Sequence, residues 1–195
     1  MLSSIHPLGE RARNNRWWLT VTAFTVGAMA TGALVGGSLG LIGSRFVADI
    51  SPLAAIGATA GVALVAGLLD LVPVKPPGPK RQVNETWIGA FRGWVYGGGF
   101  GMELGLGFLT YVVTWAVYSM FVSEILTASP GFGAVVGMTF GLGRSATLLI
   151  AAVVDRPTRL TSFNRALAKA GPIVRRTTAL GLIALGTVVL AMGSI

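Results

Sequence analysis

Five apolar segments dominate this sequence, and each is long enough to cross the hydrocarbon core of a bilayer as a helix. Such a crossing takes about 20 helical residues. The segments are Trp17–Ile42, Leu53–Val74, Trp94–Val122, Phe132–Val154 and Ile173–Met192. Only 11% of the residues are charged, whereas soluble domains average about 25%. We therefore predict an all-α, polytopic integral membrane protein, with five transmembrane helices in one membrane domain over residues 1–195.

The basic residues are distributed unevenly around these segments. If successive segments alternate in direction, 13 of the 15 Lys and Arg residues fall on one side of the membrane. They are Arg11, Arg13, Arg16, Lys75, Lys80, Arg81, Arg92, Arg156, Arg159, Arg165, Lys169, Arg175 and Arg176. Basic loops remain in the cytoplasm, so we expect a cytoplasmic N-terminus and a C-terminus outside the cell membrane. This topology accounts for the net charge of +8, and we expect no nucleic-acid partner.

The connection between the fourth and fifth segments is amphipathic. Over residues 158–170, apolar side chains recur at helical spacing (Leu160, Phe163, Leu167 and Ala170) while the basic ones occupy other faces. This pattern predicts a helix that lies in the cytoplasmic interface and contacts anionic membrane lipids. Such a helix serves either as an ordered connector between the two spans or as a docking site for a partner protein.

Two opposite charges lie inside predicted spans. Glu103 and Arg144 are each about 15 Å from the cytoplasmic end of their span at about 1.5 Å per residue. Because intramembrane charges are usually paired, we predict an ion pair between them. The pair either locks two helices together or belongs to a solute-binding or proton-conducting site. Asp70 lies nearer its membrane end, where it is either solvated or hydrogen-bonded locally.

Glycines recur every three or four residues in the first, third and fourth segments. They occur in LVGGSLGLIG, GGGFGMELGLGFL and GFGAVVGMTFGLG. Close packing between helices explains this spacing. The alternative is a helix broken at Gly97–Gly99, beside Glu103, as in many transporters.

Further along the third segment, three residues fall near the helical face that carries Glu103: Thr110, Thr114 and Trp115. With Asp70, they are candidates for lining a cavity. Contact with neighbouring helices or with the outer membrane interface explains them equally well.

The composition excludes several kinds of chemistry. The chain has no cysteine, and His6 is its one histidine. Disulfides, thiolate ligands, histidine-based metal centres and catalytic triads are therefore excluded. We expect no metal, no cofactor and no enzymatic activity.

The order of segments resembles the cytochrome c biogenesis thiol-transport family, which includes CcdA and the membrane domain of DsbD. The resemblance lies in GGGFGMELGLGF, GMTFGLGRSATLL, the basic connector DRPTRLTSFNRALAKAGPIVRR and LGLIALGTVVL. It covers most of the chain, without the family's first helix. The family's two redox cysteines are absent, so the resemblance implies no catalytic residue and no dithiol–disulfide exchange.

These features favour a membrane protein of transporter type that binds or moves a small solute or ion at a site around Glu103 and Arg144. The alternative is a non-catalytic scaffold subunit for a partner protein, such as a redox or maturation enzyme. Helices with small-residue faces commonly bury those faces against another helix. We therefore expect a homo-oligomer or a complex with another membrane protein.

Overall fold

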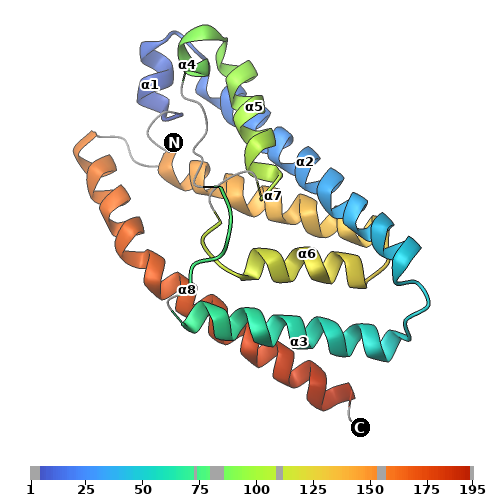
Figure 1. Ribbon diagram of the computed structural model, residues 1–195. Helices are drawn as coiled ribbons and strands as arrows, with labels where there is room; N and C mark the ends of the chain where they lie inside the picture. Colours follow the sequence, from blue (N-terminus) through green and yellow to red (C-terminus); the bar gives the residue numbers. More distant parts are fainter. Residues whose placement is uncertain (1–4, 73, 80–85, 109–111, 153–156, 194–195) are drawn as a thin grey trace. The chain divides into compact units, whose positions relative to one another are not determined.

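The computed structural model describes residues 5–72, 74–79, 86–108, 112–152 and 157–193, and all the regular structure in them is helical. The eight helices are α1 (Pro7–Ala12), α2 (Trp17–Phe46), α3 (Pro52–Leu71), α4 (Trp87–Ala90), α5 (Gly93–Gly105), α6 (Ala116–Leu126), α7 (Pro130–Ala152) and α8 (Pro157–Gly193) (Figure 1). The predicted all-α fold is confirmed.

Four helices within the described residues are long and apolar enough to cross a bilayer. They are α2, α3, Pro130–Ile150 of α7 and Ala168–Met192 of α8. They correspond to the first, second, fourth and fifth predicted segments, with boundaries that differ by a few residues. The chain is therefore a multi-pass membrane protein.

The third predicted segment, Trp94–Val122, is not one helix but two. α5 ends at Gly105 and α6 begins at Ala116. Gly107 has a φ of 70°, a left-handed conformation that glycine adopts without steric cost and that commonly ends helices. The β-branched residues Val112, Val113 and Thr114 favour extended backbone over helix. The single helical face expected to join Glu103 to Trp115 therefore does not exist.

Residues 158–170 were predicted to form a separate interfacial helix that ends at Gly171-Pro172, and they do not. Instead, α8 continues through Pro172 to Gly193. A proline inside a helix loses one backbone hydrogen bond, but its fixed φ is itself helical. The helix therefore passes this residue without ending.

The chain forms two compact units, each built from three separate stretches. The first contains residues 1–34, 79–111 and 136–168, and the second contains residues 35–78, 112–135 and 169–195. The core of the first unit is a cluster of buried side chains from the N-terminal segment, α2, α5 and α7: Ile5, Val21, Phe24, Tyr96, Phe100 and Leu148.

Glycines bring the helices of the first unit into backbone contact. At Gly97, an added Cβ atom would lie 2.5 Å from the carbonyl oxygen of Thr20. One turn further along α5, a Cβ at Gly101 would overlap the carbonyl of Phe24 and lie 2.9 Å from its Cα atom. This confirms that the glycines serve close helix packing. Gly97–Gly99 lie inside α5, so the helix does not break there.

The second unit has further close contacts of this kind. A Cβ at Gly36 of α2 would overlap the carbonyl of Gly133 in α7, and one at Gly43 would overlap the carbonyl of Ile125 in α6. α3 packs along α6 in the same unit (Figure 1). A Cβ at Gly67 of α3 would lie 2.8 Å from the carbonyl oxygen of Ala179 in α8. Within this unit, α6 therefore packs against both α2 and α3.

Candidate functional site

A buried carboxylate lies beside the N-terminus of α6. This is the point at which the third predicted apolar segment becomes helical again after the end of α5. Asp70, in the last turn of α3, is 1% exposed. Its two carboxylate oxygens accept the backbone N–H of Trp115 at 3.0 and 3.1 Å. Trp115 directly precedes the first residue of α6. Because a helix N-terminus carries unpaired N–H groups and a partial positive charge, Asp70 stabilises the point at which the chain becomes helical again.

Two further bonds fasten the segment after α3 to the first turn of α6. The indole Nε1–H of Trp115 donates to the carbonyl oxygen of Val74 at 3.3 Å. The hydroxyl of Tyr118 donates to the carbonyl oxygen of Pro77. Of the two readings open for Asp70, the structure therefore shows the hydrogen-bonded one. Asp70 and Trp115, both predicted as cavity-lining residues, are in direct contact.

We predict that Asp70→Ala destabilises the protein by about 2 kcal/mol, because it leaves the partly buried N–H of Trp115 without its acceptor. Asp70→Asn should cost less, since the amide oxygen can still accept this bond. Stability against denaturant in one detergent measures both variants. The exposed acid Asp49 provides the control Asp49→Ala, which should unfold as the wild type does. Equal losses in the two Asp70 variants would contradict this prediction.

Glu124, also on α6, is a buried carboxylate that the sequence reasoning missed. It is 1% exposed, and neither Oε1 nor Oε2 has a hydrogen-bond partner among the described residues. A Cβ at Gly36 would lie 3.0 Å from its Oε1 atom, so the carboxylate borders the α2–α7 crossing. The third span was predicted to end at Val122 and to be followed by an external loop. Glu124 comes two residues after Val122 and so fell within that expected loop. The apolar Ile125 and Leu126 after it are a sequence signal that the buried segment continues.

The structure does not join Glu103 and Arg144 as predicted. No ion pair between them is present in the described part of the chain. Instead, Nη1 of Arg144 donates to the carbonyl oxygen of Leu104 at 3.4 Å, and the guanidinium lies 5.4 Å from the ring centroid of Phe140. The part of α5 that Arg144 contacts is therefore the backbone carbonyl of Leu104 and not the Glu103 carboxylate. Leu104 directly follows Glu103 in α5.

The remaining candidate residues are dispersed. Thr110 lies outside the described residues. Thr114 is half-buried. Trp115 borders an apolar pocket of about 430 Å³ between α3 and α6, together with Val62, Val65, Leu69, Tyr118, Ser119 and Val122 among others. An apolar pocket in a membrane protein suits an acyl chain better than a charged solute.

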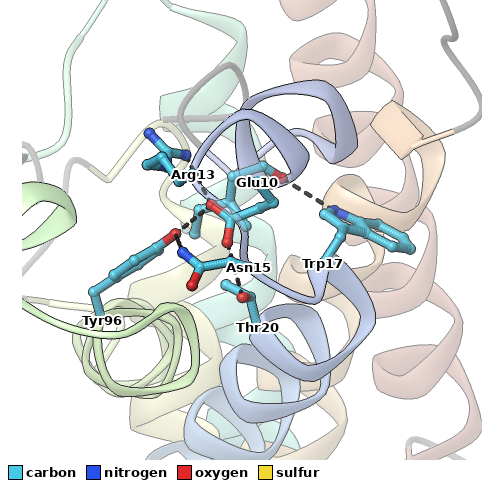
Figure 2. A network of polar contacts seen from close by, with 7 residues as sticks. Glu10, Arg13, Asn15, Trp17, Thr20 and Tyr96 are labelled. Atoms are coloured by element: carbon cyan, nitrogen blue, oxygen red, sulfur yellow. Dashed lines mark hydrogen bonds and ion pairs between the residues drawn. The ribbon is translucent and has the colours of Figure 1, made fainter.

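A second polar cluster, also missed from the sequence, lies in the first unit (Figure 2). Glu10 of α1 is fully buried. Its Oε1 atom accepts from the Tyr96 hydroxyl of α5 and from Nη2 of Arg13 at 2.7 Å. Its Oε2 atom accepts from Oγ1 of Thr20 in α2 at 3.0 Å. The carboxylate thus connects three helices, and its bonds are satisfied.

Metal binding finds no support in this arrangement. In the part of the chain that the structure describes, no three or more His, Asp or Glu side chains are grouped so that they could hold a metal ion. Of the buried carboxylates, Asp70 and Glu10 each have partners, whereas both oxygens of Glu124 remain available as acceptors.

Comparison with known proteins corrects the resemblance to thiol-transport proteins. The similar proteins carry the name methylamine utilization protein MauF. The one from Paracoccus denitrificans is 32% identical over 148 residues, which cover 73% of this chain and 53% of that protein. The one from Paracoccus versutus is 32% identical over 73% of this chain and 54% of the relative. The one from Methylorubrum extorquens is 33% identical over 62% and 42%.

No family model matches the chain, and no solved structure matches it. The likeness to CcdA and DsbD is therefore overturned, because glycine-rich apolar helices of unrelated proteins share their spacing for reasons of packing alone. This chain is similar to the MauF proteins, and it spans about half the length of the relatives it matches.

Proposed function

We propose that the protein is a membrane transporter that serves methylamine utilization and moves a small cationic solute. The observation that carries this proposal is the interrupted third apolar segment. α6 resumes at a buried carboxylate, Asp70, and bears a second buried carboxylate, Glu124, whose oxygens have no described partner.

The physical basis is the cost of such features in lipid. Non-helical backbone at membrane depth leaves N–H and C=O groups that need partners, so it is tolerated where protein surrounds it or where it lines a cavity. Helices broken in this way form solute and ion sites in many transporters. Carboxylates inside the membrane commonly mark the paths of cations and protons.

The relatives' name suggests the solute to test first. Alkylamines, like the lysine side chain, are protonated near neutral pH. Methylammonium is therefore a cation, which a bilayer excludes and which needs a polar path through the protein. The proposal keeps the orientation predicted from the basic residues, with a cytoplasmic N-terminus. Exposed cationic side chains of α8, such as Arg165, Lys169 and Arg176, would contact anionic lipid on that side.

The test combines growth with flux. We expect deletion of the gene in its own organism to slow growth on methylamine, and the wild-type gene to restore it. Purified protein in liposomes should take up radiolabelled methylammonium faster than liposomes without protein. Asp49→Asn changes an exposed acid and is the matched control, with uptake equal to the wild type.

Two outcomes would contradict the proposal. Normal growth of the deletion strain on methylamine would remove the link to this substrate. Impaired growth without any methylammonium flux would favour the scaffold function instead, in which the protein supports a partner protein of methylamine metabolism.

A further inference from the structure

Glu124 has an unusual position within the second unit. Its side chain is almost entirely buried, and both carboxylate oxygens lack a described hydrogen-bond partner. α2 and α7 cross beside it at Gly36 and Gly133, whose backbones approach so closely that neither residue has room for a Cβ atom. The carboxylate therefore lies against helix backbone rather than in open space.

No charged side chain on the neighbouring elements compensates it. In the second unit, α2 carries one charged residue, the exposed Arg45, which follows Gly36 by nine residues, about 14 Å along the helix. Residues 130–135 of α7 carry none. On α3, Asp70 is bonded to Trp115, and on α6 itself the Tyr118 hydroxyl is bonded to Pro77. Within the described residues, Glu124 has no counter-ion.

An ionised carboxylate in such a setting costs several kcal/mol. Either a bound cation or a proton removes that cost. The space beside Oε1 is narrow, because a Cβ placed on Gly36 would lie only 3.0 Å from this atom and would overlap the Gly133 carbonyl. A hydrated metal cation or an alkylammonium ion needs more room than this, whereas a proton needs none.

We propose that Glu124 is a proton-binding site, which holds a proton while α6 lies against the α2–α7 crossing. When α6 separates from this crossing and water enters, the O–H bond breaks and the proton passes to water. The resulting carboxylate is then stabilised by hydration. The proton site itself does not depend on the proposed function. Only its coupling to solute movement rests on that function.

The proton can be detected directly by infrared spectroscopy of the purified protein in lipid. We expect the wild type near neutral pH to show the C=O stretching band of a buried carboxylic acid, with a shift to lower frequency in D₂O. Glu124→Gln should lack this band, and Asp49→Asn, which alters an exposed acid, should retain it. A wild-type spectrum without the band would overturn the proposal, since Glu124 would then be ionised.

A second measurement uses the wild type alone and so does not depend on whether a variant folds. Hydrophobic carbodiimides add to protonated carboxylic acids in apolar surroundings. We expect dicyclohexylcarbodiimide to label Glu124 and not Asp49, as located by mass spectrometry of peptides, with labelling that declines as the pH rises. Absence of label on Glu124 at every pH would overturn the proton site.

Liposomes separate this inference from the proposed function. In wild-type liposomes, a pH gradient should change the rate of methylammonium uptake several-fold, and in Glu124→Gln liposomes it should not. Absence of any methylammonium flux in the wild type, with the acid band present, would reject the proposed function and leave the proton site standing. Flux without the acid band and without the pH response would reject the proton site alone.

Discussion

Gly101→Ala is expected to destabilise the protein by about 3 kcal/mol, the upper part of the range for overpacked cores. The added methyl group would overlap the carbonyl of Phe24 and lie 2.9 Å from the Cα atom of that residue. These are backbone atoms inside α2, which cannot rotate away as a side chain can. The two helices would have to move apart, and the core contacts of Phe24, Tyr96 and Phe100 would loosen with them.

The matched control lies on the same helix, three residues earlier. At Gly98 the nearest atom to an added Cβ, the carbonyl oxygen of Ala23, is 3.9 Å away, an ordinary van der Waals contact. Gly98→Ala should therefore leave stability unchanged or raise it by about 0.5–1 kcal/mol, the difference in helix propensity between the two residues. Denaturant titration of both variants in the same detergent measures the difference. Similar stabilities would mean that α2 and α5 do not touch at Gly101.

Glu10→Ala is expected to have an effect of similar size, about 3–5 kcal/mol, for an electrostatic reason. The substitution removes the acceptor for the Tyr96 hydroxyl, for Oγ1 of Thr20 and for the guanidinium of Arg13 (Figure 2). Removing one member of a buried charged network costs about this much, because the groups left behind are desolvated without partners. α1 should detach from α2 and α5.

A double-mutant cycle with Tyr96→Phe tests whether the network acts as a unit. Tyr96→Phe alone should cost about 1–2 kcal/mol, and adding it to Glu10→Ala should cost less than that, since the hydroxyl has already lost its acceptor. Asp49→Ala, an exposed acid outside the network, should unfold as the wild type does. Strictly additive losses for Glu10 and Tyr96 would show that the two residues do not interact.

Gly93 illustrates how closely this network is packed. A Cβ at this position would lie 2.5 Å from Oγ1 of Thr20 and 3.0 Å from Oε2 of Glu10. The first residue of α5 is therefore required to be small so that the carboxylate of α1 can reach the hydroxyls of α2 and α5. Nothing in the local sequence around Glu10 indicates this, because Thr20 and Tyr96 follow it by 10 and 86 residues.

The sequence by itself determined the class of protein and most of its helices. A run of about 20 apolar residues has few stable conformations in lipid other than a helix, because every backbone polar group must be paired within the segment. Hydropathy is a local property, so α2, α3, α7 and the later part of α8 were predictable. The glycine spacing also showed close packing, since small residues every three or four positions form one helical face.

Only the tertiary structure decided where the apolar segment of α5 and α6 breaks and which polar groups meet. The predicted depths of Glu103 and Arg144 within their spans suggested an ion pair, but the guanidinium of Arg144 donates to the carbonyl oxygen of Leu104 instead. Likewise, Glu124 lies just past an apolar run, and its burial follows from the crossing of α2 and α7. The exposure and partners of a charge depend on residues distant in the chain, which a local pattern does not contain.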